Sequence, residues 1–213
     1  MPLYTTLIFL SLAFLCSLTL FFRNNVSRYL KLFPFFLLFA VVVESVSEYL
    51  VAHRHYNTAL LSPATTLYIC FYLYTLYQII HNRRVKKILI WVIIVYPIIC
   101  AVNILFIQKP PQFHNLTYSL GGFLIVIASI YYFLELFQAE YTVNLLREPA
   151  FWICTGLLLF FTYSFYLYGF SGLRANRKFF KYLYVLYDVS DIFLYSLFSI
   201  AFLCTIRISK SSS

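Results

Sequence analysis

Long runs of apolar residues alternate with short polar segments along the whole chain. The runs cover residues 3–22, 32–51, 64–80, 88–107, 118–136, 150–170 and 182–206. About 20 apolar residues form a helix that crosses the hydrocarbon core of a bilayer. Backbone groups in lipid must bond to one another, and the runs are continuous rather than alternating, so helices are favoured over a β-barrel. We predict an all-α fold, a polytopic transmembrane bundle of about seven helices.

The segments between the runs predict a single unit over residues 1–213. They are short, contain no Gly/Ser-rich linker and show no internal repeat. The first run lacks a charged n-region and a small-residue cleavage site, so we expect a retained helix rather than a signal peptide. Pro97 predicts a kink in the fourth run.

Composition supports a location in the cell membrane. Hydrophobic residues make up 62% of the chain and charged residues 11%, with a net charge of +9. The basic residues cluster beside apolar runs, as expected for topology signals and contacts with anionic headgroups, so we expect no nucleic-acid partner. The five cysteines lie within apolar runs without a CxxC spacing, and we predict no metal and no cofactor.

Lys and Arg residues indicate the orientation. With the N-terminus outside, ten of the 16 face the cytoplasm and six face outward. The segment 171–181 contributes four of those six and breaks the rule, which leaves its side of the membrane open. The cytoplasmic cluster that we expect to contact anionic lipid or an acidic partner consists of Arg83, Arg84, Lys86 and Lys87.

Four carboxylates lie inside two of the apolar runs. Glu44 and Glu48 are four residues apart, and Asp188 and Asp191 are three apart, so each couple shares a helical face. A charge at the centre of a span costs about 2.5–3.5 kcal/mol, and such acids usually face the bundle interior or a wet cavity. Our orientation places all four in the outer half, with Asn103 at a similar depth. This predicts an outward-facing polar pocket.

Other interpretations of these residues remain open. The acids would also serve as structural locks if they paired with Arg174 or Arg177. Tyrosines recur in the third and sixth runs, where they would either pack or donate hydrogen bonds to Glu44 or Asp191. His53 and His55 stand at one loop edge and do not make a zinc site of the kind found in intramembrane hydrolases.

Four segments resemble a known group of proteins. They are FPFFLLFAVVVE (33–44), YQIIHNRRVKKI (77–88), LREPAFWICTGLLLFF (146–161) and DIFLYSLFSIAFL (191–203). The chain resembles a family of small, uncharacterised bacterial seven-helix membrane proteins that are similar to the membrane regions of sensor kinases. That family often carries a second acid in its third helix, where this chain has Cys70 or its neighbours.

We therefore expect a non-enzymatic membrane protein with a sensory or signalling role, with a kinase as a possible partner. Glu44, Asn103 and Asp191 would receive a proton, a small cation or a polar ligand from outside. The main alternative is a transporter or channel in which the same acids line a permeation path. A third is an intramembrane lipid-modifying enzyme with Glu44 or Asp188 as general base, for which the chain offers no nucleophile or metal set.

Overall fold

The fold of the chain is known from a computed structural model that describes residues 4–23, 26–109, 112–138, 145–169 and 177–210. Those residues form helices and no strand, which confirms the predicted all-α class. The elements, in chain order, are α1 (Tyr4–Leu18), α2 (Arg28–Ala52), α3 (Thr58–Ile79), α4 (Arg83–Val102), the π-helical turn η1 (Asn103–Ile107), α5 (Asn115–Phe137), the short 3-10 turn η2 (Leu145–Arg147), α6 (Pro149–Gly169) and α7 (Arg177–Lys210).

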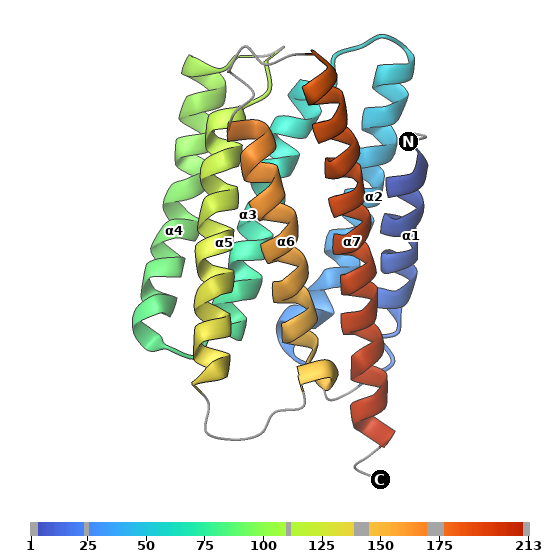
Figure 1. Ribbon diagram of the computed structural model, residues 1–213, viewed down its shortest axis with the longest axis vertical. Coiled ribbons are helices and arrows are strands. Elements are labelled where there is room, and N and C mark those ends of the chain that lie inside the picture. The colour runs from blue at the N-terminus through green and yellow to red at the C-terminus, as the bar shows by residue number, and fades with distance from the viewer. Residues whose placement is uncertain (1–3, 24–25, 110–111, 139–144, 170–176, 211–213) are drawn as a thin grey trace.

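Seven helices run up and down the long axis of one bundle, and the two chain ends lie at opposite ends of it (Figure 1). α7 packs between α6 and α1, and α1 continues the ring to α2. α3 contacts α2, α4 and α5 and so occupies the middle of the other side. α4 packs mainly on α3 and only weakly on α5, which leaves it at the periphery. The connections therefore alternate between the two ends.

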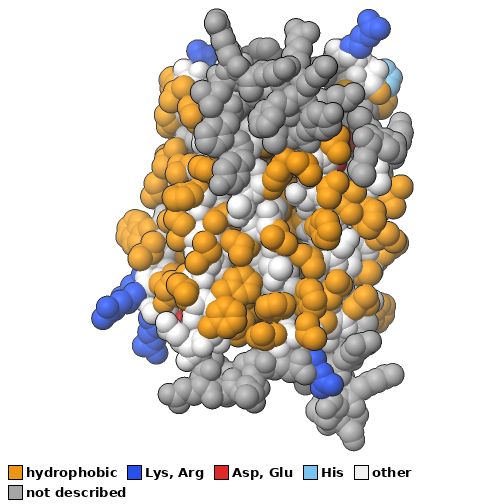
Figure 2. Space-filling view, viewed as in Figure 1, with side chains coloured by type: hydrophobic (Ala, Val, Ile, Leu, Met, Phe, Trp, Pro, Cys, Tyr) orange, Lys and Arg blue, Asp and Glu red, His pale blue; other side chains and the backbone are white. Residues whose placement is uncertain are grey.

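The outer surface is apolar along the middle of the bundle. Figure 2 shows hydrophobic side chains over the centre of this face and Lys and Arg at its two ends. Large apolar side chains such as Trp91 (69% exposed) and Phe106 (74%) point away from the core. A soluble protein would bury this much contiguous apolar surface, whereas a bilayer solvates it. The distribution is that of a protein embedded in a membrane.

Helix lengths agree with this conclusion. Within the described residues, five helices are long and apolar enough to span a bilayer: Arg28–Ala52, Thr58–Ile79, Arg83–Ile107, Asn115–Phe137 and Val185–Thr205. α1 and α6 contribute the shorter apolar segments Thr5–Leu18 and Pro149–Phe165. The chain is an integral membrane protein with seven helices, five of which meet the length for a span.

Aromatic rings join α2, α3 and α7 in the half of the bundle near the start of α2. The fully buried Phe33 ring lies 5.0 Å from the ring of Phe71, 5.4 Å from Phe198 and 5.3 Å from Phe202, each in an edge-to-face geometry. Such pairs contribute about 0.5–1.5 kcal/mol each beyond the burial of their area. Phe33 therefore fixes the distance between α2 and α7 at this level.

Gly121 permits the close contact between α3, α4 and α5. A Cβ atom added there would lie 2.5 Å from the Oη atom of Tyr96 and 2.7 Å from Cδ1 of Ile69. The Tyr96 hydroxyl donates to the carbonyl oxygen of Thr117 at 3.0 Å, one turn earlier in α5. Small residues allow such approaches between membrane helices.

Candidate functional site

Glu44 of α2 and Asp191 of α7, which we call the acid pair, interact electrostatically across the bundle. Both side chains are half-buried. The two acids also interact with the same phenols, those of Tyr68 on α3 and Tyr195 on α7. Glu44 lies eight residues before the end of α2, which corresponds to about 12 Å along the helix. Two spans far apart in sequence thus bring carboxyl groups to one region of the interior.

The other two predicted acids extend the acid pair on either side. Glu48, one turn further along α2, interacts with Glu44. Asp188, one turn earlier in α7, interacts with Asp191. Both are half-buried. The four acids form one electrostatically connected group, and Glu48 and Asp188 lie nearer the end of the bundle where α2 stops and α7 starts.

The acid pair has no hydrogen bond or ion pair to a basic side chain within the described residues. Arg174 and the side chain of Arg177, the partners expected for structural locking, lie outside the described residues. Carboxyl groups in a region of low dielectric are in general stabilised by a proton, a cation or water.

Three phenols on neighbouring helices lie within electrostatic reach of Asp191. They belong to Tyr72 on α3, Tyr118 on α5 and Tyr187 on α7. The buried hydroxyl of Tyr68 has no hydrogen-bond partner, so a donor is available beside the acid pair. No hydrogen bond among the described residues joins one of these phenols to Glu44 or Asp191, so the predicted hydrogen bonds from tyrosine to the acids stay a prediction.

Asn103 belongs to a different set of contacts. Its side chain is 3% exposed, and its Nδ2 donates to Oε1 of Gln108 at 2.9 Å and to Oγ1 of Thr117 at 3.1 Å. None of its hydrogen bonds reaches an acid, and its partners come from the α4–α5 edge of the bundle. The sequence grouped Asn103 with Glu44 and Asp191 on depth alone, but depth does not specify which helices are neighbours.

His114 is a buried polar residue that the sequence did not single out. It precedes α5, is fully buried, and places Nε2 3.3 Å from Oγ1 of Thr65 on α3. Burial lowers the pKa of His114 to about 4. By contrast, His53 and His55 are exposed at the end of α2, and the described residues contain no group of three His, Cys, Asp or Glu side chains arranged to hold a metal.

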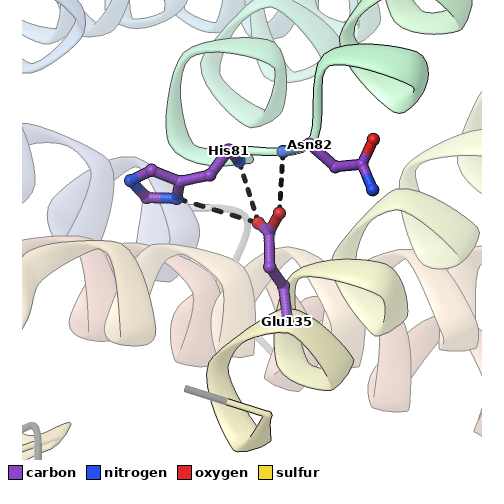
Figure 3. A network of polar contacts seen from close by, with 3 residues as sticks. All are labelled: His81, Asn82 and Glu135. Carbon is purple, nitrogen blue, oxygen red and sulfur yellow. Dashed lines mark hydrogen bonds and ion pairs between the residues drawn. The ribbon is translucent and has the colours of Figure 1, made fainter. Parts of the chain in front are cut away.

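Glu135, near the end of α5, organises the start of α4 at the opposite end of the bundle (Figure 3). Its Oε2 accepts from the backbone N–H of His81 at 2.9 Å, and its Oε1 accepts from the N–H of Asn82 at 2.7 Å. His81 Nδ1 lies 3.8 Å from Oε2, but the His81 side chain is 87% exposed, so this ion pair contributes little. Asn82 in turn accepts from the N–H of Arg84 at 2.9 Å and caps the helix.

The predicted basic cluster follows directly on this capped start of α4. Arg83, Arg84 and Lys87 are exposed, and the Lys86 ammonium lies 5.3 Å from the centre of the Tyr77 ring. Sequence reasoning identified the four cations but missed Glu135, because the carboxylate comes from a residue more than 50 positions away. Exposed positive charge and a hydrogen-bonded turn therefore occur together at the start of α4.

Comparison with known proteins finds no protein family, no curated protein and no solved structure that matches this chain. The resemblance to bacterial seven-helix proteins related to sensor kinases stays a prediction.

Proposed function

We propose that this integral membrane protein senses protons or a small cation at the acid pair of Glu44 and Asp191. The observation that carries the proposal is their mutual interaction inside the bundle without a basic partner among the described residues. Two negative charges close together in a low dielectric repel strongly, and one bound proton or cation between them relieves that repulsion. The nearby phenols supply hydrogen bonds to whichever charge state results.

Occupancy of the acid pair would alter the spacing between α2 and α7, whose side chains meet in the core while α1 packs on both helices. The ring of Phe33 contacts Phe198 and Phe202 of α7 about three turns of α2 away from Glu44. Repulsion between empty carboxylates favours a wider spacing at the acid level, whereas a bound cation favours a closer one. A ligand shifts such an equilibrium by its difference in affinity for the two states.

The output would leave the bundle at its other end. With the N-terminus outside, the acid pair lies in the outer half and the basic cluster of Arg83, Arg84, Lys86 and Lys87 lies at the cytoplasmic surface. Its exposed cations suit anionic headgroups or an acidic surface of a partner such as a kinase. We propose this orientation together with the sensory role.

Carbodiimide labelling tests the acid pair directly, because a hydrophobic carbodiimide reacts with protonated carboxyl groups in membranes. We expect mass spectrometry of the protein in lipid nanodiscs to locate the adduct on Glu44 or Asp191. Labelling should fall as pH rises and when Na⁺ or K⁺ is added. In Asp191→Asn, the cation concentration that protects Glu44 should rise by about tenfold, since the cation loses a charged ligand.

Glu135→Gln provides the matched control, because it removes a carboxylate at the other end of the bundle and should leave protection of Glu44 unchanged. An adduct on neither acid, or labelling that ignores both pH and cations, would refute the site. Unchanged protection in Asp191→Asn would show that the two carboxylates do not act together.

Transport is the second candidate, and the row of four acids favours it. Glu48 and Asp188 continue the acid pair toward one end of the bundle, as the entrance of a permeation path would require. Flux of Na⁺, K⁺ or protons into proteoliposomes separates the two candidates. A sensor passes none of them above the rate of empty vesicles, whereas a transporter gives a flux that Glu44→Gln abolishes.

A further inference from the structure

An open groove of about 340 Å³ lies between α4 with η1 and α5. Its walls are apolar and include Val102 and Ile107 on one side and Leu116 and Leu120 on the other. All four side chains are exposed, so the groove opens away from the bundle, toward the region that a bilayer occupies. The volume falls within the range of small-molecule sites.

One hydrogen-bond acceptor beside this groove has no donor, the side-chain oxygen of Asn103. Asn103 and Thr117 are the polar residues of its lining. The Nδ2 group of Asn103 is fully used by Gln108 and Thr117, whereas its Oδ1 is buried and has no hydrogen-bond partner. A buried acceptor left unpaired costs about 1–3 kcal/mol, so the groove would bind a molecule that brings a donor. Asn103 also begins the π-helical turn η1, and such turns are frequent at functional sites.

The depth of the groove indicates the class of molecule. Leu116 is the second residue of α5 and Ile107 is the last residue of η1, so the groove lies at the helix ends, where polar headgroups meet acyl chains. Lys109, exposed two residues beyond Ile107, adds a positive charge at the same end. An occupant there needs an apolar chain for the walls, a hydrogen-bond donor for Asn103 and a phosphate for the lysine.

We propose that the α4–α5 groove binds a glycerophospholipid whose headgroup carries an N–H or O–H donor. The acyl chain covers the apolar walls, and the Asn103 side chain, buried just behind them, turns its Oδ1 toward the groove to accept from the headgroup. Phosphatidylethanolamine and phosphatidylglycerol meet this requirement, and phosphatidylcholine, whose ammonium carries no hydrogen, does not. This site is independent of the acid pair, since Asn103 has no hydrogen bond to either acid.

Native mass spectrometry of the delipidated full chain, titrated with each of the three lipids, tests this assignment. We expect the two donor lipids to bind about three- to tenfold more tightly than phosphatidylcholine, the effect of one net hydrogen bond. Asn103→Leu should reduce that preference to about onefold. Leu120→Trp fills the groove and should weaken the binding of all three lipids.

Ile127→Trp is the matched control for Leu120→Trp. Ile127 is an exposed residue two turns further along α5, outside the groove lining, and the substitution should leave lipid binding unchanged. Equal affinity for all three lipids in the unaltered protein would overturn the proposal. So would unchanged binding in Leu120→Trp, or the finding that Leu120→Trp instead abolishes a dimer, because a second copy would then occupy the groove.

Discussion

His114 combines complete burial with an ionisable ring. The Thr65 hydroxyl donates to the carbonyl oxygens of Leu61 at 2.8 Å and Ser62 at 3.1 Å, so its oxygen accepts from the His114 Nε2–H. The tautomer follows from this network, and it leaves Nδ1 unprotonated, buried and without a partner. Protonation of Nδ1 would place an uncompensated positive charge between α3 and α5.

Acid should therefore weaken the fold through His114. Its pKa is about 4 in the folded protein against 6.5 in an unfolded chain, so stability is complete above pH 6.5 and is lost as pH falls toward 4. Between pH 7 and 4.5 we expect a loss of about 2 kcal/mol from this group. Thermal unfolding in detergent at both pH values measures it. His114→Gln keeps a donor near Thr65 and should show a smaller drop in Tm, and an equal drop in both proteins would contradict this account.

The sequence alone identified only some of the polar residues that lie inside the bundle. Glu44 and Asp191 stand out because a carboxylate within an apolar run has a high cost that sequence alone reveals. His114 does not stand out, since its burial depends on Thr65, a residue 49 positions away. Asn103 was recognised as polar and deep, but its neighbours Gln108 and Thr117 depend on how α4 lies against α5.

At the level of helices, Glu135 of α5 connects to the turn between α3 and α4, a contact that the hydrophobic pattern of the sequence does not indicate. One carboxylate of α5 accepts from the backbone N–H groups of His81 and Asn82, which lie between α3 and α4. These groups lie at the helix N-terminus, where partial positive charge favours an anion. The interaction holds the α3–α4 turn against α5 and fixes where the basic cluster begins.

Glu135→Gln should loosen that turn, because a neutral amide has one acceptor oxygen and cannot receive both N–H groups equally. We expect a loss of about 1–2 kcal/mol in stability and faster amide hydrogen exchange at His81 and Asn82. His81→Ala is the control, since it removes only the exposed ion pair and should leave both quantities nearly unchanged. If the two variants behave alike, the side-chain ion pair and not the backbone contact holds the turn.

The sequence predicted where the helices are, but it predicted their first and last residues less well. All seven apolar runs are helices, but α4 begins at Arg83 rather than 88 and α7 spans Arg177–Lys210 rather than 182–206. Polar residues continue each helix beyond its apolar part, with a cap such as Asn82 setting the end. The length of an apolar run corresponds to the thickness of the hydrocarbon core, whereas the helix itself can extend beyond that core.

The hydrophobic pattern of the sequence does not predict which helices are neighbours in the bundle. The sequence predicts the alternation of directions, since consecutive spans cross in opposite senses. It does not predict that α1 closes the ring against α7, nor that α4 is peripheral. Those contacts depend on shape, such as the space above Gly121 and the rings around Phe33, which only the packed bundle defines.

Cysteine accessibility tests the bundle and its orientation together. In a cysteine-free background, an impermeant maleimide should label His55→Cys in intact cells, but Arg84→Cys and Arg147→Cys only after lysis. Figure 1 shows why: the connection after α2 lies at one end of the bundle, and those before α4 and α6 lie at the other. The described residues at positions 55, 84 and 147 are all exposed, so a lack of label reflects the membrane and not burial.

If Arg84→Cys and Arg147→Cys were labelled in intact cells and His55→Cys only after lysis, the N-terminus would face the cytoplasm. The acid pair would then lie in the inner half of the membrane. Equal labelling at 55 and 84 would show that α3 does not cross. Ser171→Cys, outside the described residues, should follow His55→Cys, because α6 lies between it and position 147.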